Sequence, residues 1–190
     1  MAKKAKKKDG LTCFEVISFE EFEALERKAS FRHIKWLLTN CDVRFQEIAL
    51  MRIPELSLKD RKRLIPLLVD LSLNHQDPNI YCKAQKRLAE IGKYAVPELI
   101  LRIDGKNDSK FSRLTDIFEM IGSEAVDPLI DFIRASDNYN SKICGVIALG
   151  RIGNPAQKAI PLLIEMLNDM EFMMDDGVIR YALYKINKRE

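Results

Sequence analysis

Apolar residues recur along the chain in runs that end with an isoleucine and a glycine. The clearest examples lie in the segments AEIGKYAVPELILRI (89–103), EMIGSEAVDPLIDFI (119–133) and GRIGNPAQKAIPLLIEML (150–167). Their glycines, Gly92, Gly122 and Gly153, are 30 and 31 residues apart. Self-similarity at a fixed period of this length is typical of repeat architectures, in which each unit is one supersecondary element. The pattern therefore predicts a stack of similar units.

Each unit has the pattern of two helices. Before the glycine, apolar residues follow at helical spacing, as at Ile143, Ile147 and Ile152. The glycine then provides the left-handed residue that commonly ends a helix. A proline follows near the expected first turn of the second helix, where its missing N–H has no intrahelical partner to lose. These prolines are Pro66, Pro97, Pro128 and Pro161. A stripe on the second helices should face the core: Leu99/Ile100/Ile103, Leu129/Ile130/Ile133 and Leu163/Ile164/Leu167.

The repeat region is predicted to be almost entirely helical. Residues 42–186 should form about nine helices and no strand, given two helices in each period. Aspartates precede successive first helices, where a carboxylate can accept hydrogen bonds from the free N–H groups of the first turn. The expected caps are Asp42, Asp77, Asp108 and Asp137.

Segments with different patterns flank the clearest repeats. A diverged copy occupies residues 48–73, and a truncated copy, VIRYALYKI, occupies residues 178–186. Ser18 and Glu21 have the spacing of a capping box for a helix up to about residue 29, and residues 31–40 have the pattern of a second helix. We expect this pair to cover the first edge of the stack, which would otherwise expose its apolar face. The predicted organisation is a disordered basic tail (1–10), N-terminal capping helices (11–41) and a repeat domain (42–190).

These repeats resemble the HEAT-repeat family, in particular the short HEAT-like repeats first noted in phycobilisome lyases. The resemblance covers roughly residues 42–186 and is carried best by LGRIG (149–153) followed by AIPLL (159–163). The unit at 42–75 departs from the family pattern, because Pro54 follows Ile53 where Ile-Gly is expected. The resemblance implies an all-α fold: a right-handed α-solenoid of about four to five helical hairpins, with the second helices lining the concave face. It implies no single activity.

Composition and charge narrow the classes of protein. Of 190 residues, 47% are hydrophobic and 31% are charged, a balance typical of a globular domain with an apolar core. No run approaches the roughly 18 apolar residues of a membrane-spanning helix, and the N-terminus lacks the apolar stretch of a secretory signal. The four cysteines are scattered without a CxxC pair, which favours reduced thiols over a metal site or a disulfide framework. We therefore expect a cytoplasmic protein.

No residue pattern in the chain is typical of an active site. The two histidines, His33 and His75, have no cysteine, histidine or carboxylate at metal-ligand spacing. The glycines lie at repeat boundaries rather than in a phosphate-binding loop, and nucleophile motifs such as GxSxG are missing. The sequence therefore predicts a protein that is not an enzyme and that holds no cofactor and no metal.

Aligning the repeats predicts one constellation on the second helices. The position after the apolar pair holds Asp70, Leu101, Asp131 and Glu165, and the next position holds Leu71, Arg102, Phe132 and Met166. Equivalent positions of stacked repeats form rows, so we expect an acidic row beside an apolar row. Such a surface suits a basic amphipathic helix or an extended peptide. The predicted partner-binding residues are Asp70, Asp131, Glu165, Arg102, Phe132 and Met166. The alternative is that the carboxylates only solvate this face and that the apolar residues pack between repeats.

The charge distribution and the resemblance leave other partners open. Residues 1–10, MAKKAKKKDG, hold five lysines and one aspartate, so the remaining 180 residues carry a net charge of about −1 out of the total of +3. Such a tail either contacts nucleic acid or another anionic surface weakly or only solubilises the protein. We favour a scaffold or adaptor that binds another protein or peptide.

Two alternatives rest on the resemblance to HEAT-like proteins. Some HEAT-like solenoids are DNA glycosylases that hold duplex DNA against a basic concave surface, but the second helices here are acidic. The repeat subtype also suggests a bilin lyase-like subunit, although no pair of cysteines or histidines marks a chromophore pocket. The sign of the charge on the second helices discriminates among these functions, because basic residues would favour phosphates and acidic residues favour a basic peptide.

Overall fold

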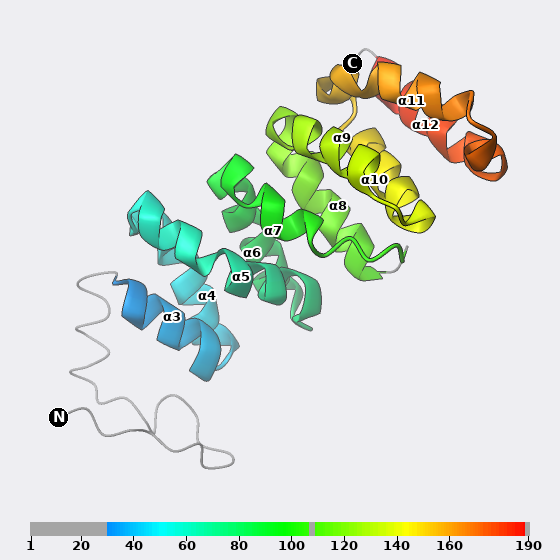
Figure 1. Ribbon diagram of the computed structural model, residues 1–190. Coiled ribbons are helices and arrows are strands. Elements are labelled where there is room, and N and C mark those ends of the chain that lie inside the picture. The colour runs from blue at the N-terminus through cyan, green and yellow to red at the C-terminus, as the bar shows by residue number, and fades with distance from the viewer. Residues whose placement is uncertain (1–29, 107–108, 189–190) are drawn as a thin grey trace, which may run out of the picture.

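The computed structural model describes residues 30–106 and 109–188, and within these ranges the chain is helical and contains no strand. The predicted basic tail (1–10), the capping-box helix before residue 30 and the expected cap Asp108 lie outside the described residues. Figure 1 shows the helices as an array that runs from α3 at one end to α11 and α12 at the other. The prediction of an all-α helical repeat array is confirmed.

Each repeat unit except the truncated last one, α12, contains a first helix, a short 3-10 turn and a second helix. The first helices are α4 (Val43–Arg52), α6 (Pro78–Ile91), α8 (Ser109–Ile121), α10 (Tyr139–Ile152) and α12 (Asp176–Asn187). The second helices are α5 (Leu58–Asn74), α7 (Val96–Ile100), α9 (Val126–Ala135) and α11 (Ile160–Leu167). The turns between them are η1 (Ile53–Glu55), η2 (Gly92–Tyr94), η3 (Gly122–Ala125) and η4 (Asn154–Ala159), and η5 (Met170–Asp175) precedes α12. From α4 onward, the described residues thus hold the predicted nine α-helices.

The helices stack in the order of the chain. Each first helix packs against the next one, from α4 through α6, α8 and α10 to α12, and α7 lies between α5 and α9 in the row of second helices. The helix predicted over residues 31–40 is present as α3 (Phe31–Asn40), and it packs against α4. This arrangement gives the array one side made by first helices and another made by second helices.

Glycines set the boundary between the helices of three units. Gly92, Gly122 and Gly153 have φ angles of +63°, +70° and +71°, in the left-handed region that L side chains rarely adopt. The Gly153 N–H donates to the Leu149 carbonyl at 3.2 Å, which closes the end of α10. The prediction that these glycines end the first helices is confirmed.

Two local predictions were wrong, each because a different polar residue caps the helix. Asn138, and not Asp137, caps α10, because its Oδ1 accepts the Ser141 N–H at 2.9 Å. Pro66 lies inside α5 rather than near its start, since Ser57 caps an earlier beginning of that helix. Asp42 and Asp77 cap α4 and α6 as predicted.

The core follows the repeated stripe of the second helices. Leu68, Leu99, Leu129 and Leu163 occupy equivalent positions and are all fully buried. Ile130 is partly buried against the same core, but Ile164, which we expected in the stripe, is 49% exposed. Neighbouring repeats are also joined by polar contacts: the Lys93 N–H donates to Glu124 at 2.9 Å, and Lys158 pairs with Asp127 at 2.9 Å.

The cysteines differ in state. Cys82 and Cys144 are free thiols, but Cys41 is disulfide-bonded, so the expectation that all four cysteines are reduced was wrong. Sequence spacing cannot reveal a disulfide that depends on chain folding. Over the described ranges, no helix has both the length and the apolarity to cross a membrane.

Candidate functional site

The exposed side chains of the second helices form two rows. One row contains the carboxylates predicted from the repeat alignment, and the other lies four residues earlier, on the same side of each helix. We call the two rows together the second-helix face, and every residue in it is exposed: Asp70, Leu101, Asp131 and Glu165 in one row, and Pro66, Pro97, Asp127 and Pro161 in the other. The predicted row of carboxylates is therefore at the surface.

The carboxylates of this face differ in their partners. Asp70 accepts a hydrogen bond from the Asn74 side chain at 2.8 Å, and Asp127 is paired with Lys158. Asp131 and Glu165 make no ion pair or side-chain hydrogen bond with another described residue. These two side chains, on α9 and α11, are thus the carboxylates most available to an external cation.

The predicted apolar row does not lie at the surface. Leu71 and Met166 are only 7% and 4% exposed, and Phe132 is half-buried against the core. These side chains follow the carboxylates by one residue, a rotation of about 100° that turns them toward the core. Their placement is that of the alternative interpretation, in which they pack within the array. As a surface contact for a partner, Met166 is therefore excluded.

Other apolar side chains are exposed on or beside the second-helix face. Leu101, which stands in the row of carboxylates, is 77% exposed, and Ile164 lies next to Glu165. Arg102 is exposed just beyond α7 and forms an ion pair with Glu98 at 2.8 Å, so its charge is partly neutralised. The repeat alignment placed Leu101 in this row but assigned it no role in binding.

Glu165 and Met166 meet in a small cavity. It has a volume of about 190 Å³ and lies at the ends of α9 and α11, beside the start of α10 and η5. Met166 and Phe172 belong to its buried wall. Its charged lining consists of three carboxylates and two cations: Glu165, Asp169, Glu171, Arg134 and Lys142. The structure thus brings one buried and one exposed residue of the predicted site into contact with the same cavity.

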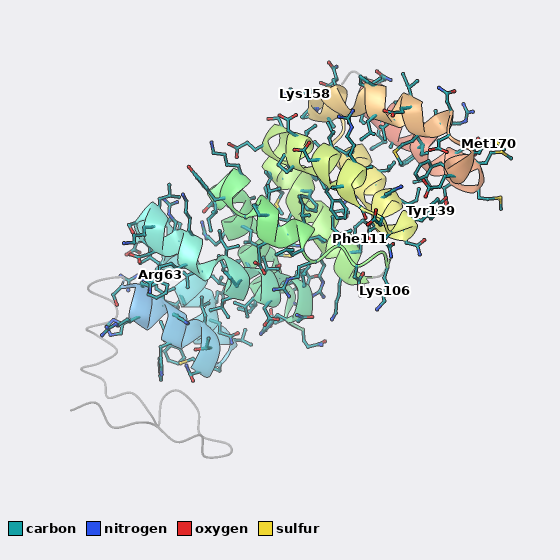
Figure 2. All side chains as sticks on the ribbon, in the orientation of Figure 1. Arg63, Lys106, Phe111, Tyr139, Lys158 and Met170 are labelled. Carbon is teal, nitrogen blue, oxygen red and sulfur yellow. The ribbon has the colours of Figure 1, made fainter. Side chains whose placement is uncertain are left out.

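A larger cleft lies at the opposite edge of the array. Figure 2 shows Lys158, which precedes α11, and Met170, which follows it, at opposite ends of the last repeat. The cleft has a volume of about 610 Å³, lies on the Lys158 edge and is lined mainly by the last turns of first helices. Its lining residues are Glu119, Arg151, Ile152, Gly153, Asn154, Pro155, Lys185 and Lys188.

Of the two histidines, the residues with catalytic or metal-binding potential, one takes part in local hydrogen bonds and the other is exposed. His75 accepts the Asp77 N–H on Nδ1 at 3.1 Å, and its carbonyl accepts a hydrogen bond from Arg113 at 3.0 Å. His33 is exposed on α3. In the part of the chain that the structure describes, no three residues among histidine, cysteine, aspartate and glutamate are grouped so as to hold a metal ion.

Comparison with known proteins identifies one repeat. Residues 145–169 match the family model of the PBS lyase HEAT-like repeat. The match begins within α10, includes η4 and α11, and ends just before η5, so it covers most of one hairpin of the array. No curated protein and no solved structure matches the chain.

Proposed function

Because residues 145–169 form a HEAT-like repeat of the PBS lyase type, and such repeats generally mediate protein interactions, we propose that the protein is a non-enzymatic scaffold. It binds a basic segment of another protein on the second-helix face. One observation carries this proposal: Asp131 and Glu165 are exposed at equivalent positions of successive repeats, and neither forms an ion pair with another described residue.

The carboxylates and the apolar residues contribute differently to binding. An exposed ion pair contributes only about 0.2–1 kcal/mol, so the carboxylates mainly raise the association rate and select against acidic partners. Complete burial of one leucine side chain contributes about 1.5–3 kcal/mol. Leu101 and Ile164 are therefore the residues expected to lengthen the lifetime of the complex.

The spacing of the second helices specifies the pattern of the partner. Packed helices lie about 8–10 Å apart, and an extended peptide advances about 3.3 Å per residue, so it crosses one helix about every three residues. A partner that contacts Asp131 on α9 and Glu165 on α11 thus needs basic residues about three positions apart. A contact to Asp70, two helices away on α5, adds a basic residue about six positions from the one at Asp131.

A pair of synthetic peptides tests this proposal. One carries lysine at every third position between alanine and leucine, and the other has the same composition with its lysines contiguous. Surface plasmon resonance should show faster association of the first peptide, with a rate that falls as salt rises, because screening weakens steering. Asp131→Lys and Glu165→Lys should each slow association, and Leu101→Ala should mainly speed dissociation.

The control for these variants is Asp137→Lys. Asp137 is an exposed aspartate in the loop before α10, outside the second-helix face, and this change alters the net charge by the same amount. Equal association rates for Asp131→Lys and Asp137→Lys would show that only the overall charge matters, and the proposed face would then have no part in binding.

A further inference from the structure

The 610 Å³ cleft on the Lys158 edge carries a charge pattern that the second-helix face does not explain. Three cations line it, Arg151, Lys185 and Lys188, against a single carboxylate, Glu119. Arg151 belongs to the last turn of α10, and Lys185 to the last turn of α12. The cleft is therefore built by first helices and is separate from the second-helix face.

Lys185 is the repeat equivalent of Arg151. The sequence ALGRI (148–152) at the end of α10 recurs as ALYKI (182–186) at the end of α12. Arg151 reaches back to the preceding first helix, where it pairs with Asp116 and, at 3.1 Å, with Glu119. An arginine in this position thus ties its repeat to the one before.

Lys185 lacks the partners that its equivalent has. The residues one period after Asp116 and Glu119, by the 31-residue spacing of Gly122 and Gly153, are Ile147 and Gly150. Neither residue carries a charge, and Lys185 forms no ion pair with any residue that the structure describes. Lys185, a partly buried residue, therefore lines the cleft without an ion pair to a described carboxylate.

Ion pairs and helix ends offset much of the positive charge at the cleft, but they leave two lysines without a carboxylate partner among the described residues. A cation in the last turn of a helix offsets a partial charge of about −0.5 at that end, and α10 and α12 both end at the cleft. Arg151 is already held by Asp116 and Glu119, so the cations of the lining that form no ion pair with a described residue are Lys185 and Lys188. The exposed Asn154 side chain adds a neutral hydrogen-bond donor to the lining.

We propose that this cleft binds a phosphate group through Lys185 and Lys188, with Arg151 and Asn154 beside it. A compact, multiply charged oxyanion matches ammonium donors from one helix end, because charge-assisted hydrogen bonds to phosphate oxygens are the strongest that lysine makes. No aromatic side chain lines the cleft, so base stacking is not part of the recognition. The phosphate group belongs either to a free phosphate ester or to a phosphorylated side chain of a protein partner.

The test is a titration of the full chain, followed by ¹H–¹⁵N correlation spectra at constant ionic strength. The probes are inorganic phosphate, a phosphoserine peptide and the same peptide without phosphate. Saturable shifts are expected at the amides of Gly153, Asn154 and Lys185. Lys185→Gln should weaken phosphate binding about fivefold, as loss of one partly exposed charge contact does. Lys86→Gln, at an exposed lysine on α6, should leave the affinity unchanged.

A gain of affinity provides the decisive control. Glu119→Gln removes the one carboxylate in the lining, while Arg151 keeps its ion pair with Asp116. This variant should bind phosphate several-fold more tightly, a result that misfolding cannot produce. Equal affinities for inorganic phosphate and the phosphoserine peptide identify a free ester as the ligand, and tighter binding of the peptide identifies a phosphorylated partner.

Three results would overturn the proposal. They are shifts scattered over surface lysines without saturation, the same loss of affinity in Lys86→Gln as in Lys185→Gln, and no gain in Glu119→Gln. These measurements do not involve the second-helix face. A negative result for phosphate would therefore leave the scaffold proposal intact, and a negative result for the lysine peptides would leave the phosphate proposal intact.

Discussion

Replacing Leu163 with alanine tests the register of the repeat array most severely. Leu163 is 0% exposed in α11, and it is the last of four equivalent leucines in the core. Removing a fully buried leucine side chain loses about 1.5–3 kcal/mol of transfer free energy, and the cavity that remains raises the total cost to about 2–5 kcal/mol. Because α11 packs near the end of the array, we expect a value of about 3 kcal/mol, with partial collapse of the cavity.

The matched control is the neighbouring residue. Ile164 is 49% exposed, so Ile164→Ala removes about half as much buried surface and leaves no closed cavity. Its expected cost is about 1 kcal/mol. Urea unfolding, followed by circular dichroism at the helical band, measures both free energies of unfolding.

The difference in the free energy of unfolding between the two variants shows which side of α11 faces the core. If Leu163→Ala and Ile164→Ala lowered the free energy of unfolding equally, or if Leu163→Ala lowered it by less than about 0.5 kcal/mol, α11 would have to be rotated from the orientation described here. A fall in the slope of the urea dependence would have a different meaning. Each repeat contacts only its neighbours, so loss of one interface can uncouple the last repeat from the others.

Three further changes test local features. The Asp175 carboxylate accepts a hydrogen bond from Tyr139, and this bond, with burial and nearby negative charge, raises the pKa of Tyr139 to about 12. The pKa of Tyr139 is higher in the folded than in the unfolded protein, so the hydrogen bond stabilises the fold fully below about pH 10. This stabilisation is lost as the pH rises through about 12. In Tyr139→Phe, the free energy of unfolding should therefore not show this fall between about pH 10 and 12. Gly153→Ala forces an alanine into φ +71° and should lower the melting temperature, at a cost of about 1–2 kcal/mol. Asp42→Ala removes a helix cap and should cost about 1 kcal/mol in urea unfolding, whereas Asp137→Ala should cost almost nothing, because Asn138 caps α10.

The repeat pattern predicted the fold because its signals are local. A glycine that must adopt a positive φ, as at Gly92 and Gly153, ends a helix wherever it stands, and the leucines before and after it repeat with the same period. Each unit therefore specifies its own hairpin, and stacking follows from the apolar stripe. The same local logic failed at Asp137, since the next residue, Asn138, is an equally good cap.

The candidate site was predictable only in part, because it depends on contacts between repeats. The position of Asp131 and Glu165 on the outer side of their helices follows from helical spacing alone. Whether the next residue is buried depends on how the adjacent repeat packs against it. The sequence of one repeat alone does not contain this information. Met166 is covered for this reason, and Ile164 is left exposed where the stripe predicted burial.

Backbone chemical-shift mapping tests the central claim most directly. The chain of 190 residues, labelled with ¹⁵N, is titrated with the peptide that carries lysine at every third position, at low and at high salt. We expect the largest shifts at Leu101, Asp131 and Glu165, with weaker binding at high salt. Shifts confined to the first helices, or the same binding for the peptide with contiguous lysines, would contradict the assignment of the second-helix face as the binding surface.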